Sequence, residues 1–282
     1  MVNFNGTILR SDATYLNEQN RGLRYGDAAF ETIRANGGKP LFWEDHYLRL
    51  MASMRILRMD IPMNFTMEYL EEQILQTLAH NDLEGKNARI RMTVFRKDGG
   101  LYTPSQRGVD FVIEAKPLDT PFYQIEVGNY EVELFKDHYM APGLLSSVKS
   151  NNRALNVLAG IFAEENDYQN CLLINTDKKV VEAINGNLFL VKGTKIKTPP
   201  VADGSINGVL RKNLIEIIKK TEEYEIEEAS ISPFELQKAD ELFITNVISG
   251  IIAVSKYRKK KFGSEVSRKL VGRLNALVRL GA

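Results

Sequence analysis

The sequence is poor in the residues on which covalent cross-links and metal sites depend. Its 282 residues include one cysteine, Cys171, and three histidines, His46, His80 and His138. A single cysteine cannot form an internal disulfide, and its place in the apolar run CLLI is typical of a buried, unreactive thiol. The histidines lack the spacing of metal ligands and have no second cysteine to support them. We therefore expect neither a disulfide nor a bound metal ion.

Long apolar runs and an excess of one charge are also missing. Nowhere do about 18 apolar residues follow one another, and the start, MVNFNGTILRSDA, lacks the basic residues and apolar run of a secretory signal. The 37 basic and 36 acidic side chains leave a net charge of +1. The densest basic run, KYRKKK at 256–261, follows an apolar segment and is better explained as a solvated strand end or turn. These features predict a cytoplasmic protein that binds neither membranes nor nucleic acid.

What the chain does contain is a mixture of helical and extended patterns. Apolar spacing predicts helices at 44–57, at 67–79, at about 153–165 with Leu155, Leu158 and Phe162 inward, and from 208 onward. Strands are predicted at 88–96, 108–118, 123–135, 171–176, 179–183, 187–193, 241–247 and 250–254, with a hairpin at 30–43. Prolines 117 and 121 interrupt regular structure. The pattern predicts an α+β fold of two domains, a small one at 1–118 and a larger one at 122–282.

Lys149 is the first candidate for chemistry. It lies in LLSSVKSNNRALNVLAG, where small and apolar residues lead into a helix and the nearest preceding acidic residue is Asp137. Desolvation there would favour the neutral amine that forms an imine with an aldehyde cofactor. A surface lysine at a helix entrance, capped by Asn151 or Asn152, fits the same letters.

Three further features fit the binding of a phosphorylated pyridine. Glu182 in VVEAINGNLFLV has apolar neighbours, and if buried it needs a cation such as a protonated ring nitrogen; an exposed hairpin glutamate is the alternative. The segment DGSINGVLRKNLIEII places glycines before an amphipathic helix, whose first amides can bind a phosphate, although such starts are common caps. Arg49 in HYLRL can pair with the same phosphate, although an arginine on such a helix is usually solvated.

Taken together and in order, these segments resemble the class IV aminotransferases. YGDAAFETIR, HYLRL, the lysine segment, VVEAINGNLFLV, INGVLR and ELFITN carry the resemblance, which runs from about residue 3 to residue 254. It implies the two-domain α+β fold of fold type IV pyridoxal-phosphate enzymes, as in D-amino-acid aminotransferase. The family also includes branched-chain aminotransferases and aminodeoxychorismate lyases, and its members are generally homodimers, so we expect a homodimer.

The resemblance also implies roles for individual residues. Lys149 is expected to hold pyridoxal 5'-phosphate as a Schiff base in the larger domain and to shuttle the proton at the substrate α-carbon. Glu182 is expected to partner the pyridine nitrogen, and Arg49 to bind the phosphate. The other cofactor-binding residues that the resemblance implies are Val209 and Leu210, through their amides, and Asn246 and Val247.

The chain differs from other members of the family at two positions expected to contact the cofactor phosphate. Several members carry threonine where this chain has Leu210 and Val247, so two hydroxyl contacts are missing. Thr245, Asn246 or Ser205 are candidates to replace them.

The resemblance is less specific for the reaction. This chain reads Arg89-Ile90-Arg91 where branched-chain enzymes have an aromatic-x-arginine motif, and FRKDGGLYTP and ELFITNVISGI look closer to the lyases. Glu31 in FETIR is common in transaminases. We predict an aminotransferase acting on an amino acid and a 2-oxo acid, with branched-chain amino acids as the candidate donors. An aminodeoxychorismate lyase that releases pyruvate and 4-aminobenzoate, and a catalytically silent pyridoxal-phosphate protein, are the alternatives. Candidate substrate contacts are Tyr25, Arg91 and Arg96, although an exposed strand or a structural ion pair would look the same.

Overall fold

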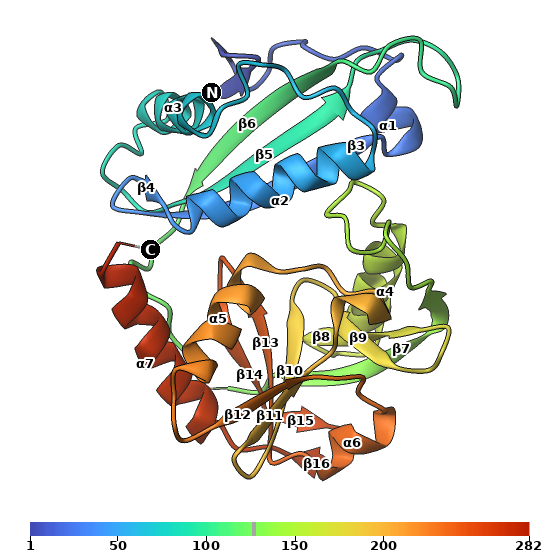
Figure 1. Cartoon of the computed structure of the whole chain (residues 1–282), viewed down its shortest axis with the longest axis vertical. Helices are drawn as coiled ribbons and strands as arrows, with labels where there is room; N and C mark the ends of the chain where they lie inside the picture. Colours follow the sequence, from blue (N-terminus) through green and yellow to red (C-terminus); the bar gives the residue numbers. More distant parts are fainter. Residues whose placement is uncertain (126–127, 282) are drawn as a thin grey trace. The chain divides into compact units, whose positions relative to one another are not determined.

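The computed structural model describes residues 1–125 and 128–281 (Figure 1). Its helices and sheets confirm the α+β prediction. The chain divides into two compact units, the first made of Met1–Pro121 and Val148–Asn152, the second of Phe122–Ser147 and Arg153–Ala282. Lys149, expected in the C-terminal domain, therefore groups with the first unit. No helix among the described residues is long and apolar enough to cross a membrane.

The first unit is built on an antiparallel six-stranded sheet in the order β2-β1-β6-β5-β3-β4. The strands are β1 (Val2–Phe4), β2 (Thr7–Leu9), β3 (Ala28–Asn36), β4 (Lys39–Pro40), β5 (Ala88–Arg96) and β6 (Val109–Pro117). The helices are α1 (Arg21–Tyr25), α2 (Trp43–Ile56) and α3 (Met67–Ala79). Apolar side chains of α2 and α3 form one core with Ile33, Ile90 and Ile113 of the sheet. The alternation of side chains along a strand places Phe30 and Arg91 on the opposite face.

Local sequence explains the hairpin between β3 and β4. Asn36 pairs with Lys39, which leaves Gly37 and Gly38 as a two-residue turn with φ of +57° and +81°. Positive φ at both central positions is the requirement of the tight turn that suits twisted strands, and glycine meets it without steric cost. A Cβ at Gly38 would also lie 2.7 Å from the backbone nitrogen of Gly85. The predicted hairpin is therefore confirmed.

The second unit contains two five-stranded sheets. One has the order β12-β11-β10-β13-β14 and the other β16-β15-β7-β8-β9. The strands are β7 (Glu131–Met140), β8 (Asn170–Asn175), β9 (Val180–Ala183), β10 (Asn187–Lys192), β11 (Lys195–Thr198), β12 (Glu225–Glu228), β13 (Glu241–Asn246), β14 (Gly250–Val254), β15 (Lys256–Tyr257) and β16 (Lys260–Lys261). The helices are α4 (Ala154–Glu165), the 3-10 turn η1 (Val201–Asp203), α5 (Val209–Lys219), α6 (Pro233–Lys238) and α7 (Glu265–Arg279). Buried side chains of both sheets share one core.

The four predicted helices are confirmed as α2, α3, α4 and α5. The inward face predicted for α4 is wrong at Leu158, which is 43% exposed, whereas Ala159 and Ala163 are buried. The strand predicted from residue 123 begins only at Glu131, and residues 126 and 127 of that prediction lie outside the described residues. The basic run at 256–261 forms β15, a turn and β16, as expected.

Candidate functional site

The backbone of the lysine segment is bonded to β3 in the first unit. The amide of Phe30 donates to the carbonyl of Lys149 over 2.9 Å, and the amide of Asn151 donates to the carbonyl of Ala28 over 3.0 Å. Ser150 lies between them, forms a bridge with Ala29 and is buried. The main chain of Lys149 is therefore held by a strand of the sheet, and its side chain is half-buried.

The ring of Phe30 lies against two basic side chains. The Nζ atom of Lys149 is 4.3 Å from the ring centroid, and the guanidinium carbon of Arg91 is 3.8 Å from it. Arg91 also donates to Oδ1 of Asn151 over 3.3 Å. Burial lowers the pKa of Arg91 from its ordinary value. Arg91, predicted as a substrate contact, thus lies beside the candidate lysine on the face of the sheet opposite α2 and α3.

A buried carboxylate holds Arg49. Glu31 on β3 accepts from Nε of Arg49 over 2.8 Å, also bonds to its Nη2, and lies 2.7 Å from Nδ1 of His46. Burial alone would raise the pKa of Glu31, but the charge and hydrogen bonds of Arg49, with the hydrogen bond from His46, lower it to about 2. The carboxylate is therefore ionised at neutral pH and fixes the direction of the Arg49 guanidinium.

His46 completes this cluster as a neutral ring. Burial lowers its pKa against the opposing effect of Glu31, so Nδ1 carries the proton that Glu31 accepts. Its Nε2 is buried without a hydrogen-bond partner in the described part of the chain. His46 was not predicted as a site residue. Its i, i+3 spacing from Arg49 on one helix is the signal that could have indicated it.

In the second unit, side chains of β9 and β10 are hydrogen-bonded to the segment before α5. Glu182 is 3% exposed, and its Oε2 accepts from the amide of Ile206 over 3.0 Å. Asn187 donates from Nδ2 to the carbonyl of Ile206 over 2.8 Å. A Cβ at Gly208 would lie 2.0 Å from Oδ1 of Asn187, so glycine permits this close approach. Glu182 is thus a buried carboxylate and not an exposed hairpin glutamate.

The start of α5, where Gly208 is the N-cap residue, has neither a side-chain cap nor an acidic residue in its first turn. The side chains of Val209 and Leu210 are buried, while the first amides of a helix have no acceptor within it and form the positive end of its dipole. In the described residues, Ser205 Oγ and Thr245 Oγ1 are buried without hydrogen-bond partners. Thr245 pairs across the sheet with Asn187.

Asn246 and Val247 make contacts within their own turn and sheet. Oδ1 of Asn246 accepts from the amides of Ile248 and Ser249, over 3.0 and 2.9 Å. The carbonyl of Val247 accepts from the hydroxyl of Tyr123 over 2.8 Å. These bonds shape the connection between β13 and β14, which begins after Asn246, the residue next to Thr245.

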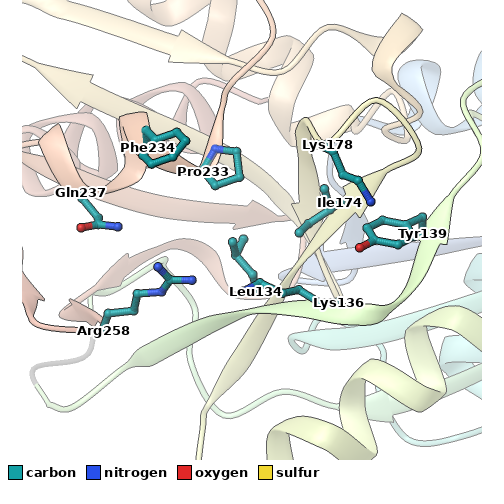
Figure 2. Close-up of a pocket in the computed structure, with 9 residues that line it drawn as sticks. All are labelled: Leu134, Lys136, Tyr139, Ile174, Lys178, Pro233, Phe234, Gln237 and Arg258. Atoms are coloured by element: carbon teal, nitrogen blue, oxygen red, sulfur yellow. The ribbon is translucent and has the colours of Figure 1, made fainter.

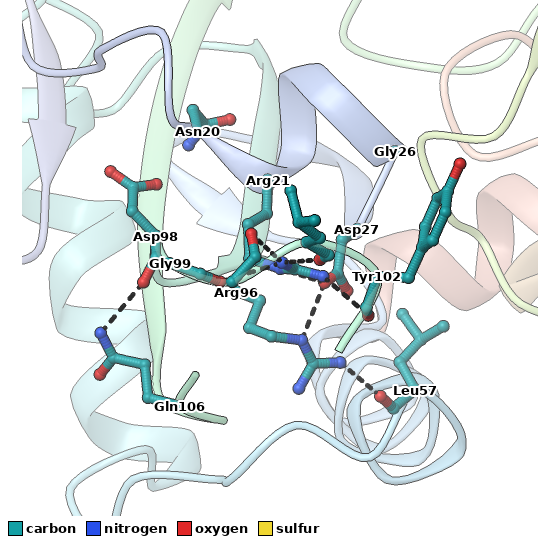
Figure 3. Close-up of polar contacts among 12 residues, drawn as sticks. Asn20, Arg21, Gly26, Asp27, Leu57, Arg96, Asp98, Gly99, Tyr102 and Gln106 are labelled. Atoms are coloured by element: carbon teal, nitrogen blue, oxygen red, sulfur yellow. Dashed lines mark hydrogen bonds and ion pairs between the residues drawn. The ribbon is translucent and has the colours of Figure 1, made fainter. Parts of the chain in front are cut away.

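Arg96 makes the contacts of a structural ion pair. Its guanidinium is buried, donates to Asp27 over 2.8 Å and reaches the carbonyls of Leu57 and Arg58, as Figure 3 shows in part. The backbone at the end of α2 therefore occupies the donors that a substrate would need. We correct the prediction and assign Arg96 no contact with substrate.

Tyr25, the other predicted substrate contact, is half-buried at the end of α1. Its ring centroid is 5.6 Å from that of Tyr102, and the guanidinium of Arg21 lies 4.9 Å from it. Tyr25 thus packs against Tyr102 and Arg21 within the first unit.

A separate cavity of about 260 Å³ lies in the second unit (Figure 2). Its lining includes the cations Lys136, Lys178 and Arg258 and the exposed ring of Phe234. None of the predicted site residues lines it, and we give it no part in the chemistry below.

Comparison with known proteins gives a consistent result. A sequence model of the family described as amino-transferase class IV matches residues 28–257. The "Putative branched-chain-amino-acid aminotransferase" of Methanocaldococcus jannaschii is 30% identical, over 97% of this chain and 92% of that protein. An aminodeoxychorismate lyase of Vibrio harveyi is 28% identical, over 90% and 94%. In structure, the branched-chain amino acid aminotransferase of Escherichia coli matches with a TM-score of 0.87 at 24% identity, over 98% and 93%.

Proposed function

Because the chain belongs to the class IV aminotransferases and has their fold, we propose that it transfers an amino group from an amino acid to a 2-oxo acid with pyridoxal 5'-phosphate as cofactor. The enzymes of this family are pyridoxal-phosphate enzymes. We also propose that it acts in the cytoplasm as a homodimer, in keeping with the resemblance and with a single, buried cysteine.

Lys149 is proposed to carry the reaction. When bound, pyridoxal phosphate supplies an aldehyde to which an amine can bond and a protonated ring that withdraws electrons from the substrate. The Lys149 amine holds the cofactor, is released when the substrate amine takes its place, and then removes the proton from the α-carbon. Main-chain bonds to β3 hold the lysine segment beside Phe30, and the Nζ atom of Lys149 lies 4.3 Å from the centroid of that ring. The same amine returns the proton.

We propose that four other side chains bind the cofactor or the substrate. The buried carboxylate of Glu182 is proposed to keep a proton on the ring nitrogen, because a buried anion is stable beside a cation. Arg49, directed by Glu31, is proposed to bind the phosphate. Arg91 is proposed to bind the substrate carboxylate and Tyr25 to contact the substrate.

The observation that carries the cofactor proposal is the start of α5. The amides of Val209 and Leu210 lie at an uncapped helix N-terminus, and a buried hydroxyl without a partner costs about 1–3 kcal/mol. Phosphate oxygens would give the hydroxyls of Ser205 and Thr245 acceptors. These two hydroxyls are our candidates for the contacts that threonines make in other members.

A second candidate function is cleavage of aminodeoxychorismate. The Vibrio harveyi relative of that name, at 28% identity, supports it, and so does the FRKDGGLYTP segment. Both reactions need the same removal of the α-proton by Lys149. They differ in whether the proton returns or a bond at the β-carbon breaks with release of pyruvate.

The first experiment is the visible absorbance spectrum of the purified protein, recorded before and after L-glutamate, branched-chain L-amino acids and D-alanine. We expect the band of a lysine-bound cofactor, and its loss with one of these donors would name the donor class. A band that no donor shifts would favour the lyase, to be tested with aminodeoxychorismate. Lys149→Ala is expected to abolish the band and to slow turnover by about 10²–10⁴-fold. An unchanged band in that variant would refute the assignment.

A further inference from the structure

Arg21 holds a whole segment of backbone in the first unit. Its Nη1 donates to the carbonyls of Gly99 over 3.0 Å and Leu101 over 2.6 Å and lies 3.4 Å from that of Gly100, and its Nη2 lies 3.4 Å from the carbonyl of Tyr102 (Figure 3). One guanidinium thus faces four consecutive carbonyls. Because its side chain is only 4% exposed, water competes little for these bonds.

A single carboxylate fixes that guanidinium. Oδ2 of Asp27 accepts from Nε of Arg21 over 2.9 Å and from Nε of Arg96 over 2.8 Å. The two arginines are oriented differently, because Arg96 faces the end of α2 and Arg21 faces residues 99–102. The network therefore joins two elements, and only its Arg21 branch reaches the segment.

The segment itself is built for one conformation. Gly99 and Gly100 have φ of +114° and +74°, where other residues are strained. A Cβ at Gly100 would lie 2.2 Å from the carbonyl oxygen of Thr103. Leu101 and Tyr102 are nevertheless 73% and 90% exposed. A fixed backbone therefore holds the exposed side chains of Leu101 and Tyr102 in one orientation. A mobile loop would leave their orientation undefined.

The same network lies next to the lysine segment. Asp27 lies between Gly26, whose carbonyl accepts from Asn152, and Ala28, whose carbonyl accepts from Asn151. Just before it, the ring of Tyr25 contacts that of Tyr102. The stretch from Tyr25 to Ala28 thus touches the held segment at one end and the neighbours of Lys149 at the other.

We propose that Arg21 is a positioning residue, oriented by Asp27, which holds Gly99–Tyr102 so that Tyr102 and Tyr25 form a fixed wall for the amino-acid substrate. The inference rests on the proposed amino transfer. Fixing the wall before binding removes the entropy cost of ordering it when substrate arrives, so the effect belongs in KM more than in kcat. The segment is then a permanent part of the site and not a lid.

The test compares the holoenzyme with two variants, Arg21→Met and Arg96→Met. Each removes one buried arginine from Asp27, and only Arg21→Met releases the segment. We expect Arg21→Met to raise KM for the amino donor about tenfold with kcat within about twofold. Arg96→Met should lower Tm as much as Arg21→Met does, with little change in KM. Gly100→Ala should reproduce the rise in KM through the clash with Thr103.

A second readout needs no turnover. Lys97 and Arg107 are exposed on either side of the segment, so trypsin cleavage after them reports its order. Cleavage should accelerate at least about fivefold in Arg21→Met and remain at the wild-type rate in Arg96→Met. Equal cleavage rates, or equal KM values, in the two variants would overturn the positioning role. Absence of turnover in the wild type would instead refute amino transfer, and the trypsin comparison would still decide the role of Arg21.

Discussion

Glu31 sets the charge balance of the cluster that holds Arg49. Its carboxylate is 1% exposed and bonds to two side chains of α2, Arg49 and His46. Its removal alone is costly, because the half-buried guanidinium of Arg49 would lose its partner carboxylate. The letters FETIR and HYLRL indicate Glu31 and Arg49 separately, and only the packing of α2 on β3 brings them together.

Replacing Glu31 with glutamine tests this balance at the scale of the residue. A pKa lowered from 4.5 to about 2 corresponds to roughly 3 kcal/mol of stability near neutral pH. We expect Glu31→Gln to lose about that much in urea unfolding at pH 7 and to bind pyridoxal phosphate more weakly. A variant as stable as wild type would contradict the charge assignment.

The same pKa values predict the acid response. Glu31 has a depressed pKa in the folded chain, so its contribution is complete above 4.5 and is lost as the pH falls towards about 2. His46 is also depressed, which makes the unfolded chain take up its proton first and lowers stability as the pH falls below about 6.5. Urea unfolding from pH 7 to pH 3 should show stability falling throughout, and the fall below pH 4.5 should be smaller in Glu31→Gln.

At the scale of elements, the proposed phosphate site depends on the N-terminus of α5, on β9 and β10, which bond to the segment before it, and on Thr245 near the end of β13. Thr245→Val removes a buried hydroxyl that has no partner in the described chain while keeping its shape. Without cofactor we expect stability to stay equal or rise by about 1 kcal/mol, and affinity for pyridoxal phosphate to fall about tenfold. Thr198→Val is the matched control, because that buried hydroxyl donates to Leu188 over 2.8 Å. It should destabilise the protein and leave cofactor affinity unchanged; the reverse pattern would remove Thr245 from the phosphate site.

The elements differ in how far the sequence could predict them. In α2, α3 and α5 the apolar residues lie on one side, so their period indicates both the helix and its buried face. In α4 apolar residues surround the axis, so the pattern does not single out one buried face, and Leu158, predicted inward, is exposed while Ala159 is buried. The missed helix α7 carries Leu270, Leu274 and Val278 at four-residue steps, so its pattern was available.

At the scale of the whole molecule, the grouping of residues 148–152 with the first unit could not be predicted from the sequence. The segment lies between two stretches of the second unit, and its place depends on backbone bonds to β3, more than a hundred residues earlier. Such pairing leaves no local pattern. The ordered motifs indicated Lys149, Arg49 and Glu182, whereas the partners that orient them came from contacts distant in sequence.

The proposed homodimer also belongs to this scale, and α4 indicates a surface for it. Val157, Leu158 and Ile161 are 59%, 43% and 45% exposed on a helix that would ordinarily turn polar side chains to water. Its last turn carries Glu164 and no basic residue, which opposes the helix dipole. An antiparallel α4 from a second copy would cover the apolar face and bring a positive helix end to that charge.

Ile161→Asp should therefore convert the dimer to monomer in sedimentation velocity, because two buried aspartates would face each other across the two-fold axis. Met63→Asp is the control, since Met63 is a fully exposed apolar residue of the first unit and its replacement should leave the dimer intact. If Ile161→Asp remains dimeric at wild-type affinity, the subunits meet on another face. If the wild type itself sediments as a monomer, the homodimer is wrong, and the exposed side chains of α4 must be accounted for by another partner.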